Sequence, residues 1–148
     1  MKYTVLLVED NTADILLMQR AFRHEHFSKV ALQIVKDGDA AVAYLRGEDE
    51  YADREHYPLP VLILLDLKLP RRSGHEILDW LRQQPELKRL PVVILTSSRE
   101  AIDINQAYDS GVNSYLVKPT GLTALLEMMK SVNLYWLLTN EQPEIHAN

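Results

Sequence analysis

The stretch that decides the fold is "VLILLDLKLP", residues 61–70. Its first five residues, Val61 to Leu65, are all apolar, which is typical of a strand buried on both faces of a parallel sheet. The apolar run ends in a carboxylate, Asp66. This stretch raises the question of what a carboxylate does at the end of a buried strand.

The same alternation of a short apolar run and a helical pattern continues on both sides of this stretch. Strands are predicted at residues 3–9, 30–35, 61–66, 91–97 and 114–119, and helices at 11–22, 39–46, 74–83, 99–111 and 122–138. Strands separated by helices cannot pair as hairpins, so the strands should form one parallel sheet. We therefore expect an α/β fold with helices on both faces of the sheet.

Composition limits the class of protein. The 148 residues fit one domain, and 47% apolar with 25% charged residues is ordinary globular usage. The chain has no cysteine, which excludes disulfides and thiolate chemistry. A net charge of −5 gives no basic footprint for nucleic acid, and no apolar run approaches the ~20 residues of a membrane span. The start of the chain does not resemble a signal peptide, so a soluble, cytoplasmic protein is expected.

Two segments do not fit the predicted alternation of strands and helices. Residues 47–60 are polar and longer than the roughly 2 to 6 residues usual between a helix and a strand, so a surface loop is expected. Residues 139–148 are polar and contain a proline, so we expect a tail with nothing to bury. The predicted domain thus spans residues 1–138 and includes an extended last helix.

Polar or charged residues close four of the predicted strands. They are Glu9, Asp10, Asp66, Thr96 and Lys118. In open α/β sheets the ligand site lies outside the carboxyl ends of the strands, where these side chains can converge. Each residue has an ordinary structural interpretation of its own, such as Asp10 as a helix N-cap. Their joint placement at one edge is specific, because chance would have to bring carboxylates, a hydroxyl and an amine there together.

The chemistry of this set suits phosphoryl transfer. Carboxylates held close together repel each other unless a cation is present, and all-oxygen ligands favour Mg²⁺. We expect Asp10 and Asp66 to be direct ligands. A carboxylate can also attack phosphorus to form an aspartyl phosphate, and the Thr96 hydroxyl and Lys118 ammonium then supply the remaining donors.

Together these residues resemble the receiver domain of response regulators in two-component signalling, over about residues 3–138. The matching motifs are the acid pair Glu9–Asp10, Asp66 followed by "LKLP" and Gly74, Thr96 followed by Ser97, and "YLVKP" with Tyr115, Lys118 and Pro119. The resemblance implies a flavodoxin-like fold of five βα units and Mg²⁺-dependent phosphorylation of Asp66 by a sensor histidine kinase.

The resemblance also implies further roles. The metal site would include Glu9 and the backbone carbonyl of Lys68, and the switch would move Thr96 toward the phosphate and turn Tyr115 inward. Such a domain is not an enzyme beyond its own phosphorylation and dephosphorylation. No output domain follows the last helix, so a stand-alone regulator is expected. The 47–60 loop and the aromatic last helix are similar to the small regulators paired with cyanobacterial phytochromes, which makes a bacterial phytochrome a candidate kinase.

Other classes fit less well. A phosphatase of the haloacid dehalogenase type needs a second Asp two residues after the nucleophile, where this chain has Lys68. A dinucleotide-binding protein needs G-x-G-x-x-G after a strand, which the glycines never form. A receiver-like interaction module that is not phosphorylated remains the alternative. The five histidines, at 24, 26, 56, 75 and 146, show no metal-ligand spacing and are expected on the solvated surface.

The last helix carries more apolar residues than one face can bury. A core stripe is predicted at Leu122, Leu125, Leu126, Met129, Val132 and Trp136. The apolar residues left over are Leu134, Tyr135, Leu137 and Leu138. They either dock a second copy of the chain or fold back onto their own domain, and we favour a homodimer.

Overall fold

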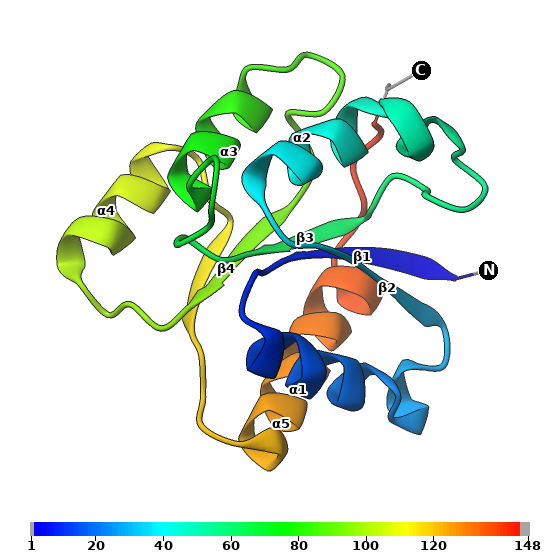
Figure 1. Ribbon diagram of the computed structural model, residues 1–148. Coiled ribbons are helices and arrows are strands. Elements are labelled where there is room, and N and C mark those ends of the chain that lie inside the picture. Colours follow the sequence, from blue (N-terminus) through cyan, green and yellow to red (C-terminus); the bar gives the residue numbers. More distant parts are fainter. Residues whose placement is uncertain (1, 146–148) are drawn as a thin grey trace.

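The protein folds around a sheet of five parallel strands in the order β2-β1-β3-β4-β5 (Figure 1). The computed structural model describes residues 2–145. The strands are β1 (Tyr3–Val8), β2 (Val30–Val35), β3 (Leu62–Leu65), β4 (Val92–Thr96) and β5 (Ser114–Val117). The helices are α1 (Thr12–Phe22), α2 (Gly38–Arg46), α3 (Gly74–Arg82), α4 (Ala101–Asp109) and α5 (Leu122–Asn133), with shorter elements η1 (Glu25–Phe27), η2 (Asp49–Ala52) and η3 (Leu134–Thr139). The predicted flavodoxin-like α/β fold is confirmed.

Strand β3 lies in the middle of the sheet and is buried on both faces. Because side chains alternate along a strand, Leu62 and Leu64 join the core beneath α1 and α5, whereas Ile63 and Leu65 join the core beneath α2 and α3. Figure 1 shows these two helix layers on opposite sides of the sheet. Burial on both faces explains why the strand is an unbroken apolar run.

Polar side chains fix where helices begin. The Asn11 side chain accepts a hydrogen bond from the backbone N–H of Asp14 at 3.0 Å and so caps α1. Ser73 and Glu76 form a reciprocal capping box at the start of α3. Since Asn11 provides the cap of α1, the carboxylate of Asp10 is left for another role.

Residues 47–60 are more ordered than the expected surface loop. The Arg54 guanidinium donates hydrogen bonds to the carbonyls of Tyr44 and Leu45, at 2.8 and 3.1 Å. Tyr44 in turn donates its hydroxyl to the carbonyl of Pro58 at 2.7 Å. The carbonyls of Tyr44 and Leu45, in the last turn of α2, thereby gain a donor from outside the helix. The segment is held against α2 by contacts that its polar composition did not predict.

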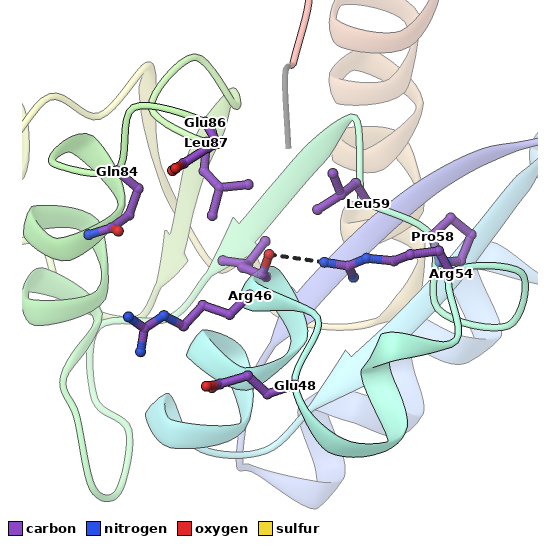
Figure 2. Close-up of a pocket in the computed structure, with 9 residues that line it drawn as sticks. Arg46, Glu48, Arg54, Pro58, Leu59, Gln84, Glu86 and Leu87 are labelled. Atoms are coloured by element: carbon purple, nitrogen blue, oxygen red, sulfur yellow. Dashed lines mark hydrogen bonds between the residues drawn. The ribbon is translucent and has the colours of Figure 1, made fainter. Parts of the chain in front are cut away.

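The same segment lines a pocket with a volume of about 630 Å³ (Figure 2). The other walls are the end of α2 and the loop between α3 and β4. Pro58 and Leu59 precede β3, and Leu87 precedes β4, so the pocket lies at the edge where strands begin. It is therefore at the opposite edge from the polar residues that close the strands.

The polar tail does bury a side chain, which corrects the expectation that it has nothing to bury. Ile145 packs against the core beneath α2 and α3. The carbonyl of Glu144 accepts a hydrogen bond from Arg89 at 3.4 Å, and the Gln142 side chain donates one to the carbonyl of Trp136 at 2.6 Å. The tail therefore runs from the end of α5 to the other layer of the domain, as Figure 1 shows in red. His146 lies outside the described residues.

The last helix changes geometry after Asn133, where η3 continues it as a π-helix. A π-helix has more residues per turn than an α-helix, so the inward face shifts along the sequence. Leu137 is consequently only 4% exposed, which corrects its predicted place on the surface. Leu134, Tyr135 and Leu138 are exposed as expected, at 59%, 53% and 69%.

Arg82 at the end of α3 holds several loops together. Its guanidinium donates hydrogen bonds of 2.8 to 2.9 Å to the carbonyls of Lys88, Leu90 and Gly111 and to the side chain of Asn113. The Asn113 side chain also accepts from the backbone N–H of Val92 at 2.7 Å, at the start of β4. One arginine therefore ties α3 to the segments that lead into β4 and β5.

We predict that Arg82→Ala lowers the free energy of unfolding by about 2 to 3 kcal/mol, because hydrogen bonds from a charged group are lost and their acceptors lose their partner. Urea unfolding measures the change. Arg20→Ala is the matched control, since Arg20 is exposed in the last turn of α1. Equal stability of the two variants would contradict this role of Arg82.

Candidate functional site

Three carboxylates meet at the edge where the strands end. Oxygen atoms of Glu9, Asp10 and Asp66 lie within 4.8 Å of one another. The register of the sheet explains their meeting, because Val8 pairs with Leu65 and the next residue of each strand leaves the sheet at the same level. Three carboxylates at this spacing form the oxygen donor set that a hard divalent cation prefers.

Two of the three carboxylates are buried and held by the backbone. Glu9 accepts hydrogen bonds from the N–H groups of Asp10 and Asn11, both at 3.1 Å. Asp66 accepts one from the N–H of Leu67 at 2.8 Å. Asp10 is exposed. The site therefore has a fixed base and one side open to solvent.

The ammonium group of Lys118 is the counter-charge of the site. Its Nζ lies 2.6 Å from Glu9, 2.8 Å from Asp14 and 3.1 Å from Asp66. Burial alone would lower the pKa of Lys118, but hydrogen bonds to Asp14 and Glu9 and the charge of Asp66 raise it above its ordinary value. Lys118 therefore stays charged. Asp14 was not predicted from the sequence, although a carboxylate in the first turn after Glu9 and Asp10 was a usable signal.

Burial dominates the titration of Glu9. It raises the pKa of Glu9 to about 7, and the charge of Asp66 acts in the same direction. The hydrogen bonds from Lys118 and from the N–H of Asn11 only partly offset these effects. The lysine alone therefore does not compensate the three carboxylates, and the residues present fit a bound divalent cation.

A cleft with a volume of about 460 Å³ opens above Asp66. Its lining includes Thr96, which is 2% exposed, and the side chain of Lys68, which is exposed. The Tyr115 hydroxyl donates a hydrogen bond to the carbonyl of Ser98, in the loop after β4, at 2.9 Å. All the strand-end residues predicted from the sequence thus lie at this edge, and Tyr115 contacts the loop that forms one wall of the cleft.

His75 departs from the expectation that the histidines are solvated. Its side chain is only 13% exposed, and its ring nitrogens have no hydrogen-bond partner among the described residues. Nε2 lies 3.5 Å from Asp103, an ion-pair distance without hydrogen-bond geometry. The sequence did not predict this contact, because it depends on how α3 packs beside α4.

The profile of the response regulator receiver domain matches residues 5–130. The chain belongs to this family. Response regulator Rcp1 of Synechocystis sp. (strain ATCC 27184 / PCC 6803 / Kazusa) is 42% identical over 139 residues, which are 94% of this chain and 92% of Rcp1. The crystal structure of the phosphorylated cyanobacterial phytochrome response regulator RcpA is 41% identical with a TM-score of 0.89, covering 97% of this chain and 100% of RcpA.

The receiver domain is thus similar to regulators associated with cyanobacterial phytochromes, as the sequence predicted. It is also 40% identical to the probable methanogenesis regulatory protein FilR2 of Methanothrix harundinacea (strain 6Ac), over 95% of this chain and 88% of FilR2. A sequence identity of about 40% is therefore not restricted to regulators associated with phytochromes. Within residues 2–145, no helix is both long and apolar enough to cross a bilayer.

We predict that, without metal, the free energy of unfolding of the wild type falls relative to that of Glu9→Gln as the pH rises from about 4.5 to about 7. The folded protein keeps a proton on Glu9 that the unfolded chain releases above its ordinary pKa of 4.5, so folding is favoured most at low pH. Unfolding in urea with EDTA, at several pH values, measures this difference. A constant difference between the two proteins would contradict the raised pKa.

Proposed function

We propose that the protein is a response regulator whose receiver domain accepts a phosphoryl group on Asp66 from a sensor histidine kinase in a Mg²⁺-dependent reaction. The observation that carries the proposal is the convergence of three carboxylates and the Lys118 ammonium beneath an open cleft. Membership of the receiver domain family supports the same function.

Glu9, Asp10, Asp66 and the backbone carbonyl of Lys68 would hold the Mg²⁺ ion. When bound, the cation would neutralise carboxylate charge and phosphoryl oxygen charge. The raised pKa of Glu9 supports this assignment, because a buried carboxylate that is not fully compensated favours a cation. Rcp1 gives independent support, since its crystal structure has been solved in a Mn²⁺-bound form. That structure is 41% identical to this chain, covers 96% of this chain and 99% of Rcp1, and has a TM-score of 0.83.

In phosphoryl transfer, a carboxylate oxygen of Asp66 attacks phosphorus, and the bond from phosphorus to the histidine nitrogen of the donor breaks. Lys118 would then pair with a phosphoryl oxygen, as it now pairs with Asp66 at 3.1 Å. The Thr96 hydroxyl would donate to another phosphoryl oxygen. A movement of Thr96 would be transmitted to Tyr115 through the loop after β4, because the Tyr115 hydroxyl donates a hydrogen bond to the carbonyl of Ser98 in that loop.

The proposed partners are a sensor histidine kinase, with a bacterial phytochrome as the first candidate, and a second copy of the chain. The phytochrome is supported by the similarity to RcpA and Rcp1. The homodimer is supported by the exposed apolar residues Leu134, Tyr135 and Leu138, which lie close together in η3. Leu137 no longer belongs to that surface. The alternative is a receiver-like module that binds partners without phosphorylation.

We predict that Asp66→Asn takes up no phosphoryl group from acetyl phosphate in the presence of Mg²⁺, because an amide is a poor nucleophile for phosphorus, and that the fold is unchanged. Intact mass and far-UV circular dichroism measure the two results. Asp79→Asn, an exposed carboxylate in α3, should be phosphorylated like the wild type. Wild type that stays unmodified with Mg²⁺ would favour the non-phosphorylated interaction module.

We predict that Tyr135→Glu dissociates the homodimer, because a twofold interface would bury two unpaired charges. Sedimentation velocity of wild type and variant at equal concentration measures the change. Leu16→Glu is the control, since Leu16 is also an exposed apolar residue, at 55%, but belongs to α1 and not to η3. A monomeric wild type would contradict the homodimer, and a dimeric Tyr135→Glu variant would move the interface to another surface.

A further inference from the structure

Ser98 connects three elements beside the cleft. Its hydroxyl donates a hydrogen bond to Asp103 in the first turn of α4 at 2.5 Å, and its carbonyl accepts one from Tyr115 in β5 at 2.9 Å. The N–H of Glu100 donates to the same hydroxyl at 3.2 Å. The position of the loop at residues 97–100 is therefore coupled to Asp103 on one side and to Tyr115 on the other.

His75 extends this set of contacts to α3. Nε2 of His75 lies 3.5 Å from Asp103, and both ring nitrogens are buried without a hydrogen-bond partner among the described residues. Buried polar groups without partners are unfavourable, so the nearby carboxylate of Asp103 is the interaction that offsets the burial of the His75 ring. The hydroxyl of Ser98 and the imidazole of His75 both lower the pKa of Asp103, so its carboxylate is ionised and available to both.

The first turn of α3 packs closely against the backbone of Asp66, the proposed site of phosphorylation. A Cβ at Gly74 would lie 2.2 Å from the carbonyl oxygen of Asp66, so only glycine lets the helix approach this closely. The N–H of Gly74 donates to the carbonyl of Leu67 at 2.8 Å. His75 therefore links the backbone at Asp66 to α4 through Asp103.

We propose that His75 and Asp103 are positioning residues that clasp α3 to α4, hold the loop at residues 97–100 over the cleft, and so lengthen the lifetime of a phosphoryl group on Asp66. This inference rests on the proposed function. Ser97, Ser98, Arg99, Glu100 and Asp103 all line the cleft. A looser loop would leave the phosphoryl group more open to water.

The step that the clasp would slow is hydrolysis. A water oxygen attacks phosphorus, the bond between phosphorus and the Asp66 oxygen breaks with its electron pair, and the carboxylate and inorganic phosphate result. The water gives up its proton to solvent or to the phosphate. The other charged groups at the cleft are Lys68, Arg99 and Glu100, and none of them is changed in the test.

The test compares His75→Gln, Asp103→Asn and the double variant with wild type. Each protein is phosphorylated with acetyl phosphate and Mg²⁺, the donor is removed, and the half-life of the phosphoryl group is followed by intact mass. We expect each single variant to shorten the half-life about three- to tenfold. The double variant should be no faster than Asp103→Asn alone, because that substitution already weakens the contact with His75.

A second measurement does not depend on phosphorylation. In the unmodified protein, Asp103→Asn should shift the NMR signals of the Tyr115 ring and the Ser98 amide, because the hydroxyl of Ser98 loses its charged acceptor. Asp109→Asn, an exposed carboxylate at the other end of α4, should leave these signals and the half-life unchanged. A rescue variant, Asp103→Glu, should restore part of the lifetime.

The outcomes separate this inference from the proposed function. A wild type that takes up no phosphoryl group overturns the proposed function and the lifetime claim with it. A phosphorylated wild type whose half-life is matched by both single variants overturns the clasp alone. Additive effects in the double variant, or an equal effect of Asp109→Asn, also overturn it.

Discussion

The site depends on one ammonium group placed among carboxylates. Lys118 leaves β5 and reaches Glu9 and Asp66 at the ends of β1 and β3, which are not neighbours of β5 in the sheet. The strand β4, which separates β5 from β3, ends at the small residue Thr96, whose partner in β5 is Val117, directly before Lys118. The strand order, the register and the charge balance are therefore parts of a single constraint.

The fold and the strand-end residues could be predicted because they follow from patterns along the chain. The unbroken apolar run of β3 predicts burial on both faces, and parallel strands place Asp66 and Lys118 at one edge whatever the loops do. His75 and Arg54 could not be predicted, since their partners are set by the packing of helices and loops. The inward turn of Leu137 was missed because a π-helix has no clear signal in composition.

The two edges of the sheet have different tasks. At the edge where strands begin, Arg82 and Arg54 donate to backbone carbonyls, and the tail packs its Ile145 against the core. These contacts satisfy the backbone and fix the loops. At the other edge, charged side chains contact one another and leave an open cleft. The stabilising arginines therefore act away from the carboxylates. Among the described residues, Lys118 is the one cationic side chain within 4 Å of Glu9 or Asp66.

The π-helix at the end of α5 has a consequence for how such regulators diversify. Leu137 serves the core while Leu134, Tyr135 and Leu138 face outward, so substitutions at the outward positions leave the buried side chain of Leu137 in place. Leu137 and Leu138 also lie beside Tyr3 and Val30, at the starts of β1 and β2 and so far from Asp66. Substitutions can thus change this surface while the side chains at the acidic edge stay the same.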